Sequence, residues 1–584
     1  MAAPGQVDHA APPRPRPATL VPRPPVTVRF TGTRAAEGPL NLGQLNIHQW
    51  LSGQEEHFFA AVGGELDVPA ETTVEAVTAA LAALVSRHEG LRTTYVDGEE
   101  PRQCVHAGGE LVVDVYGLSG IPTDRAAVTR NLVRRLGAAG PYRISDTPIR
   151  AAVAVLPGTE SVYAAVIGCS HYAVDYQAME ILKREFAELV RDPAARRGSP
   201  LQPLDLVALE RAPRSSRHDD AALEHWTSLL RRAPRCGYPA PRVTAEGGSV
   251  CVELSSTAAA LAVRAVTRRT RASAASVVLA AVCALISHRT GYRELVLPTL
   301  SGNRFEPHLR QHVGTLAQTT LATVTVDDGT FDQLVRQAWS SVVHACRYGR
   351  YDVYERGAVA RRVEHERGIV LDYDPLFNSL ATESRPAGGM ITALSGLDTA
   401  RQATELRRQP MPAGGPPVRF DLYETNKVVR LGCWSSDTGR VPGDDVEAML
   451  LAVENLLIAA ADGDLDMHAV RESMGLDPIS YGTGWLRTDE GWVELAEVRR
   501  LVDEALPGTG ARVFADRSLV AYLARTESVQ TPEQAHARCM AALPAHATAV
   551  TPKHYVLCDT VPSTPDDPAA WTAVSCEGPG RDKD

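Results

Sequence analysis

The sequence predicts an α/β fold of two lobes with a small carboxyl-terminal subdomain. Its 584 residues exceed the size at which a single hydrophobic core is usual, so two or three domains are expected. Hydrophobic residues make up 44% and charged residues 22%, as in ordinary globular proteins. Short apolar runs of strand character alternate with stretches of helical period, which is typical of α/β proteins.

The first lobe is predicted over residues 28–210. The sequence Thr72-Thr73-Val74-Glu75 is a capping-box pattern, and apolar residues then recur at helical spacing to about His88. A second helical period begins at Tyr176 and reaches about Val190. Between the two helices lie three apolar runs that predict strands, the last of them buried on both faces: residues 112–116, 149–156 and 161–169.

A second lobe is predicted over residues 218–465. The Pro/Arg/Ser-rich stretch 212–217 is interpreted as the linker before it. A small α/β unit is expected over 480–570, a polar tail over 571–584, and a disordered Pro/Arg-rich leader over 1–27. The clearest elements of the second lobe are a helix, two strands and a closing helix, predicted at residues 272–288, 294–300, 321–326 and 446–460.

Composition excludes several classes of function. The formal charge is −10, and no basic cluster is interleaved with aromatic residues, so nucleic acid is not an expected partner. The ten cysteines are scattered without metal-ligand spacing, which predicts no metal site and fits a reducing cytoplasm. The longest apolar stretch, residues 272–287, is shorter than a bilayer span, so no membrane association is expected.

Short motifs follow one another along residues 28–464. The most specific is Ser86-Arg87-His88-Glu89-Gly90-Leu91-Arg92-Thr93-Thr94-Tyr95. The others are Pro148-Ile149-Arg150, Ser170-His171-Tyr172-Ala173-Val174-Asp175-Tyr176, His225-Trp226, Ser301-Gly302-Asn303-Arg304, Val313-Gly314-Thr315-Leu316, Phe377-Asn378 and Phe420-Asp421-Leu422. In this order they resemble the condensation-domain family of nonribosomal peptide synthetases.

The resemblance implies two chloramphenicol-acetyltransferase-like lobes in a V, with a substrate tunnel between them. Acyl or peptidyl carrier proteins would present substrates there on phosphopantetheine arms, and the chain itself would bind no cofactor. The implied reaction transfers an acyl or aminoacyl group from a carrier thioester to an amine or hydroxyl. Its acceptor would be a small molecule or a carrier-bound group, and the product an amide or ester in natural-product or antibiotic biosynthesis.

The segment from Ser170 to Tyr176 occupies the place of the family's HHxxxDG motif, and His171 corresponds to its second histidine. Acyl transfer needs a proton acceptor within hydrogen-bond reach of the nucleophile, and imidazole suits this role at neutral pH. His171 is therefore the predicted catalytic residue, which would also position the amine and take charge in the tetrahedral intermediate. Ser170 replaces the first histidine and is expected to be structural. Tyr176 replaces glycine and is expected to narrow the acceptor side of the tunnel.

Three further residues are weaker candidates at the site. Asp175 precedes a helix, where an aspartate ordinarily caps free backbone amides. The family instead pairs this aspartate with an arginine of the second lobe, for which Arg304 is the candidate; both roles are structural. Asn378 and Trp434 are predicted to line the tunnel, although such residues more often belong to a core.

The carboxyl end carries a second resemblance. Gly491-Trp492-Val493-Glu494-Leu495 begins a series that continues through Leu519–Leu523 to Leu543–His546 and resembles the small carboxyl-terminal subdomain of an adenylation domain. Pro562–Asp567 stands where the NGK motif should be, so the catalytic lysine is missing. Activation and tethering would then come from other proteins. The segment is interpreted as a remnant kept for docking or stability, or as an appendage without a function of its own.

Three alternatives to an active condensation enzyme are considered, and the order of the motifs argues against the second. One is a catalytically silent platform that recruits carrier proteins or tailoring enzymes, which the changes at Ser170 and Tyr176 favour and His171 opposes. Another is an epimerase-type relative, because the run Val363–Arg367 superficially resembles a motif of that branch. That motif should precede Val313-Gly314, however, and here the run follows it. The third is a coenzyme-A-dependent acyltransferase of the same fold.

Overall fold

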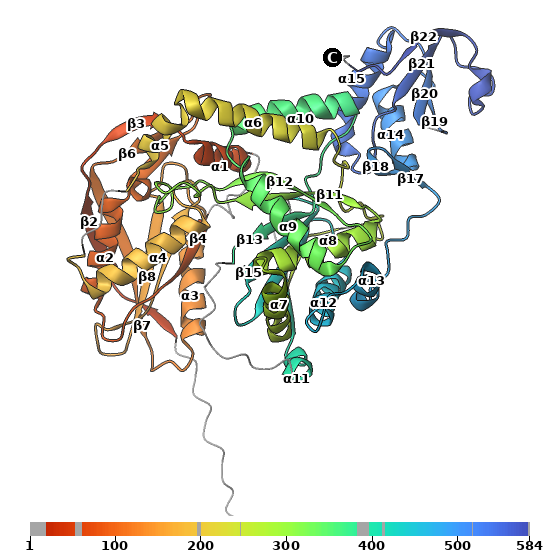
Figure 1. Cartoon of the computed structure of the whole chain (residues 1–584). Coiled ribbons are helices and arrows are strands. Elements are labelled where there is room, and N and C mark those ends of the chain that lie inside the picture. Colours follow the sequence, from red (N-terminus) through yellow and green to blue (C-terminus); the bar gives the residue numbers. More distant parts are fainter. Residues whose placement is uncertain are drawn as a thin grey trace, which may run out of the picture. The chain divides into compact units, whose positions relative to one another are not determined.

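The computed structural model confirms the α/β class and divides the chain into two compact units (Figure 1). Unit 1 consists of Met1–Ser216 and Gly302–Ala317, and unit 2 of Arg217–Ser301 and Gln318–Asp584. The segment 302–317 therefore belongs to unit 1, although it lies inside the range predicted for the second lobe. The structure describes residues 19–52, 61–195, 200–245, 247–381, 396–410, 415–516 and 518–581.

Unit 1 is built on a six-stranded sheet of order β1-β7-β8-β9-β4, in which β2 also pairs with β7. A smaller sheet has the order β3-β6-β5. The strands are β1 Leu20–Pro22, β2 Val26–Thr31, β3 Ala36–Pro39, β4 Ala61–Leu66, β5 Thr93–Val96, β6 Arg102–Val105, β7 Gly108–Leu118, β8 Ile149–Val155 and β9 Val162–Ser170. The helices are α1 Leu42–Ser52, α2 Val74–Arg87, α3 Arg125–Ala138, α4 Tyr176–Arg191 and α5 Pro203–Glu210, with the 3₁₀ turn η2 at Glu89–Arg92.

The predicted elements around the motif of unit 1 are confirmed. Strand β9 is buried on both faces: Ile167 and Cys169 belong to the core that α2 and α4 share, whereas Ala164 and Val166 pack with α3. Helix α2 begins after Thr73, whose side chain accepts a hydrogen bond from the Ala76 amide. The sequence pattern thus located the strand and the helix that flank His171.

Three predicted irregular segments are regular in the structure. Of the predicted leader, residues 1–18 lie outside the described residues, but β1 and β2 begin within residues 19–27 and pair with β7. The predicted linker is the first turn of α6, Pro213–Leu230, because proline is favoured at a helix start. The predicted polar tail contains β22, Val574–Gly578, which pairs with β21, His554–Cys558.

Unit 2 contains a seven-stranded sheet of order β12-β11-β13-β15-β16-β10-β14. Its strands are β10 Val250–Ser256, β11 Glu294–Ser301, β12 Gln318–Thr325, β13 Leu376–Ser379, β14 Glu405–Pro410, β15 Val418–Glu424 and β16 Val429–Ser435. Its further helices are α7 Thr257–Thr270, α8 Ala274–Thr290, α9 Phe331–Cys346, α10 Val353–Arg367, α11 Leu397–Arg401, α12 Gly443–Ala459 and α13 Met467–Met474.

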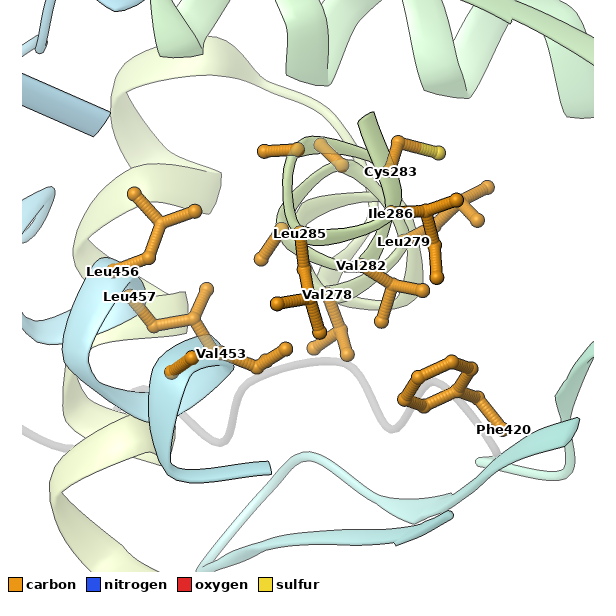
Figure 2. Packing of buried hydrophobic residues seen from close by; sticks show 14 of the residues in the cluster. Val278, Leu279, Val282, Cys283, Leu285, Ile286, Phe420, Val453, Leu456 and Leu457 are labelled. Atoms are coloured by element: carbon orange, nitrogen blue, oxygen red, sulfur yellow. The ribbon is translucent and has the colours of Figure 1, made fainter. Parts of the chain in front are cut away.

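Helix α8 is the centre of the unit 2 core, as its continuous apolar sequence predicts. Figure 2 shows Val278, Val282 and Leu285 of α8 together with Val453 of α12 and Phe420 of β15. Among the described residues, no single helix is long and apolar enough to cross a membrane. Helices α7 and α8 pass that test only as a pair bent by 103°, and both contribute many buried residues to this core.

The carboxyl-terminal subdomain belongs to unit 2 and is fixed to it by buried polar contacts. Arg367 of α10 pairs with Glu490 and donates to the carbonyls of Leu230 and Ala233. Trp492 donates its indole N–H to the Thr290 carbonyl at 3.1 Å. The subdomain comprises the hairpin β17 Trp485–Thr488 and β18 Gly491–Glu494, helices α14 Leu495–Ala505 and α15 Pro532–Ala542, and a sheet of β19 Arg512–Ala515, β20 Leu519–Ala524, β21 and β22.

The run Val363–Arg367 takes part in the same attachment. The His365 carbonyl contacts His536 Nε2 at 3.0 Å, the Glu366 carbonyl accepts from Arg581, and Arg367 pairs with Glu490. These contacts give the run a structural role in unit 2.

Replacing Arg367 with alanine should destabilise unit 2 by about 3–5 kcal/mol, because Glu490 would stay buried without its partner. The matched control is Arg408→Ala, which removes an exposed arginine from its pairs with Asp444 and Glu447 and should cost less than about 1 kcal/mol. Thermal unfolding compares the two variants. Equal melting of both would show that the Arg367 network does not stabilise the subdomain.

Candidate active site

His171 lies in the connection between β9 and α4 and is half-buried. Its carbonyl accepts a hydrogen bond from the Thr315 hydroxyl, and its ring lies edge-on to Trp50 of α1, with ring centroids 6.2 Å apart. Burial lowers the pKa of the imidazole, against the opposing effects of the His171 and Val174 backbone and the Asp175 charge. The ring is therefore neutral at pH 7 and able to accept a proton.

Asp175 joins two pieces of backbone and the Arg304 side chain at the buried start of α4. Its Oδ1 accepts from the Ala178 amide at 2.8 Å, so it caps the helix. Its Oδ2 accepts from the Leu316 amide at 2.9 Å and the Ala317 amide at 3.2 Å. Arg304 Nη1 donates to the same oxygen at 2.7 Å. One carboxylate thus serves both as a helix cap and as a partner of the arginine.

The Asp175 carboxyl is charged in spite of its burial. Desolvation alone would raise its pKa, but the charge and hydrogen bonds of Arg304 and the amides of Leu316 and Ala178 more than offset this, so its pKa lies below the ordinary value. Both side chains are less than a tenth exposed. An ion pair at this depth fixes geometry, because either charge alone would be costly to bury.

Arg304 lies in the segment 302–317, which the structure assigns to unit 1. The sequence predicted this arginine in the second lobe, with its pair to Asp175 across the lobes. In the structure both partners of the pair lie in unit 1. Arg304 also donates to the Gly314 carbonyl at 2.8 Å. Thr315, which holds the His171 carbonyl, was missed as a site residue, although it lies in the motif Val313–Leu316.

The motif Ser86–Tyr95 lies against α4 and the residues that follow His171. His88 contacts Glu185 of α4 through Nε2 and Oε2 at 2.8 Å, with both side chains buried. A Cβ on Gly90 would lie 3.2 Å from the Ala173 carbonyl, which is closer than an ordinary van der Waals contact. The motif therefore allows a close approach to the residues just after His171.

Ser170 and Tyr176 stand at the two ends of this connection. The Ser170 carbonyl accepts from the amides of Ala173 at 2.9 Å and Val174 at 3.2 Å, which makes the connection a tight turn. The Ser170 hydroxyl accepts from the Tyr172 amide at 3.4 Å. Tyr176 is the first residue of α4 and is half-buried.

Asn378 and Trp434 lie in unit 2, where each contacts one partner of the Asp421–Arg419 ion pair of β15. Asn378 donates to Asp421 Oδ1 at 2.8 Å, and Arg419 pairs with the same carboxylate while it lies 5.1 Å from the Trp434 ring centroid. Asp421 is fully buried. Asp421 and Arg419 thus connect Asn378 to Trp434. The role of these two residues in lining a tunnel stays a prediction.

One cluster in the described part of the chain has the composition of a metal site. Ligand atoms of Cys236, Asp372 and Asp374 lie within 4.8 Å of one another. The protein already provides their partners: Asp374 accepts from the amides of Gly237 and Tyr238, and Asp372 pairs with Arg235. Burial and the charge of Asp372 raise the pKa of Asp374 to about 7. We interpret the cluster as part of the unit 2 framework.

Comparison with known families identifies the class of the protein. The model of the condensation domain matches residues 35–379, which is more than half of the chain, and the protein belongs to this family. Condensation domains of this family occur in nonribosomal peptide synthetases, where they work with carrier-protein domains.

The relatives include two bacterial peptide synthetases. Phosphinothricin tripeptide synthetase PhsC of Streptomyces viridochromogenes is 27% identical over 364 residues, which cover 58% of this chain and 32% of the synthetase. N-(5-amino-5-carboxypentanoyl)-L-cysteinyl-D-valine synthase of Amycolatopsis lactamdurans is 28% identical and matches 62% of this chain but 10% of the synthase. The chain thus spans a third or less of these multidomain relatives.

Solved structures show the same fold. The first condensation domain of the calcium-dependent antibiotic synthetase with a substrate analogue superposes with a TM-score of 0.55 at 17% identity, covering 75% of this chain and 99% of that one. SgcC5 from Streptomyces globisporus gives 0.53 at 18% identity, covering 73% and 99%. These likenesses confirm the predicted chloramphenicol-acetyltransferase-like architecture.

Removing either partner of the Asp175–Arg304 pair should destabilise unit 1 by roughly 3–5 kcal/mol, because a buried charge loses its counterpart. Arg184→Ala is the matched control: this exposed arginine of α4 donates to Gln311 of the same segment and should cost less than about 1 kcal/mol. Unfolding in urea measures all three variants. Wild-type stability in both Asp175→Ala and Arg304→Ala would contradict the buried pair.

Proposed function

We propose that the chain is an active condensation enzyme that transfers an acyl or aminoacyl group from a carrier-protein thioester to an amine or hydroxyl acceptor. The observation that carries the proposal is His171, the motif histidine, held in a fixed turn with a neutral imidazole. The nucleophile attacks the thioester carbonyl while its proton passes to the imidazole. The tetrahedral intermediate then expels the phosphopantetheine thiol, which takes up a proton as it leaves.

The geometry around His171 supports this role. Thr315 fixes its carbonyl, and Asp175 fixes the first turn of α4 four residues later. Asp175 is already used by Arg304 and three amides, so it does not serve as the proton acceptor. Positioning of the ring by the surrounding backbone is worth several powers of ten in rate when the reacting groups are aligned.

The proposed partners are acyl or peptidyl carrier proteins, whose phosphopantetheine arms would bring the substrates. The chain itself is proposed to bind no metal or cofactor, and a cytoplasmic location stays a prediction. The small carboxyl-terminal subdomain is proposed to be an adenylation-type remnant with a structural role, since Arg367 and Trp492 attach it to unit 2.

Mass spectrometry of carrier proteins tests the proposal. The protein is incubated with acyl-loaded candidate carriers and with amine or alcohol acceptors, and the acyl group is followed from the thioester to the acceptor. A parallel arm supplies the same acyl group on coenzyme A. Transfer from the carrier supports the proposal, and transfer from coenzyme A alone supports the acyltransferase alternative. Carrier binding without transfer above the enzyme-free control would favour the silent platform.

His171→Ala should lower transfer by about 10²- to 10⁴-fold, the usual contribution of a positioned proton-transfer group, without changing the melting temperature. His468→Ala, which removes an exposed histidine of α13, is the control and should leave the rate unchanged. Because burial lowers the pKa of His171, the acidic limb of the kcat/KM profile should lie below pH 6.5. Near-normal turnover of His171→Ala would exclude the assigned role.

Tyr176→Gly should change the relative kcat/KM for large and small acceptors, if the phenol narrows the acceptor side. The side chain is half-buried at the first position of α4, so the competing expectation is simple packing in the helical turn. In that case the variant would lose about 1 kcal/mol of stability from the glycine backbone. Kinetics with a series of acceptors of graded size decides, and an equal loss across the series would rule out the gate.

A further inference from the structure

A buried hydrogen bond joins helix α1 to the residue next to His171. His48 Nδ1 lies 2.9 Å from the hydroxyl of Tyr172. His48 is 6% and Tyr172 7% exposed. We propose that His48 is a positioning residue, which holds the His171 turn in place through Tyr172. The inference rests on the proposed role of His171.

The two ring nitrogens of His48 have distinct neighbours. The Tyr172 hydroxyl and Nδ1 can form their hydrogen bond in either tautomer of the ring, because a phenol both donates and accepts. Nε2 lies 3.4 Å from Asp97 Oδ1, and the Asp97 side chain is mostly exposed.

The Tyr172 ring packs against a second tyrosine in the core of unit 1. Its ring centroid lies 4.7 Å from that of Tyr95 in β5, at an interplanar angle of 31°. Helix α1 is itself fixed at its start, where the Asn41 side chain accepts from the Gln44 amide at 2.8 Å and Gln44 Oε1 accepts from the Asn41 amide at 3.0 Å. A rigid helix thus presents His48 to the turn.

The same helix touches the turn at a second point. Trp50, two residues after His48, lies against the His171 ring, so α1 contacts both the proposed catalytic ring and its neighbour. Tyr172 is the chain neighbour of His171, so a shift of Tyr172 displaces the backbone that carries the His171 ring. On the other side of His171, Ser170 offers its hydroxyl to the Tyr172 amide only at 3.4 Å. The His48 bond is the shorter of the two contacts.

A simple core role for His48 would not need these polar contacts. Burying a hydroxyl and an imidazole costs free energy unless they are paired, and an apolar pair of similar shape would pack without that cost. The polar pair instead selects one direction for the Tyr172 ring. Such a directional contact is expected of a residue that positions its neighbour, and is not needed for a residue that only packs in a core.

The experiment uses three single variants of the full chain and one double variant. Tyr172→Phe removes the hydroxyl, His48→Leu removes its hydrogen-bond partner, and the double variant removes both ends of one bond. Tyr142→Phe is the control, because it removes another largely buried hydroxyl of unit 1, which donates to the Gly168 carbonyl at 2.6 Å. The reaction of His171 with diethyl pyrocarbonate, followed by peptide mass spectrometry, reports on the ring without requiring catalysis.

We expect Tyr172→Phe and His48→Leu each to change the modification rate of His171 by at least about threefold. Each should lower kcat by about tenfold to a hundredfold, because a displacement of about 1 Å can cost a hundredfold in rate. KM for the donor should stay within about twofold. The double variant should be no worse than the poorer single variant, because both remove the same bond. Tyr142→Phe should leave the modification rate and kcat unchanged even where it lowers the melting temperature.

Modification rates of His171 within about twofold of wild type in both single variants would overturn the inference. Additive losses in the double variant would also overturn it, since they would show two independent packing effects. Failure of the proposed function gives a different result: the wild-type protein would transfer no acyl group, while the modification rates would still respond to His48 and Tyr172.

Discussion

The organisation of unit 1 depends on one buried carboxylate. Asp175 accepts hydrogen bonds from the start of its own helix, from two amides of the segment 302–317 and from Arg304. These donors come from parts of the chain more than a hundred residues apart. Without the carboxylate, three backbone amides would lose their acceptor and the buried guanidinium would lose its counter-charge, and each such loss is costly. The position of His171 follows from this constraint, because it lies between β9 and the capped helix.

Other contacts also fix the position of the turn that carries His171. Thr315 holds the His171 carbonyl from the segment that Asp175 anchors, and α1 contacts the turn from another direction through Trp50 and His48. The His171 ring is therefore positioned by backbone and side chains of three separate elements. Such overdetermination is typical of sites in which a small displacement carries a large kinetic cost. It also makes Ser170 tolerable where the family carries a histidine, since other residues fix the turn.

Much of the frame was predictable from local pattern, and the long-range contacts were not. The continuous apolar run of β9 and the helical period of α4 located His171 correctly, and the motif order identified the family. Strands β1 and β2 escaped notice because proline suits edge strands and disordered leaders equally. The contact of Trp50 with His171 had no local signal, since it depends on how α1 packs. Arg304 was paired correctly with Asp175, but its unit could not be read from its position in the sequence.

The discontinuity of unit 1 has a consequence for exchanging parts between relatives. A recombinant chain joined at the boundary after Ser216 would take residues 302–317 from a different parent than Asp175. Even if both parents kept an arginine at the position of Arg304, the amides that bind the carboxylate would come from a parent whose unit 1 core packs differently. Any natural or engineered shuffling of such halves would therefore succeed most readily when this sixteen-residue segment is inherited together with the amino-terminal portion.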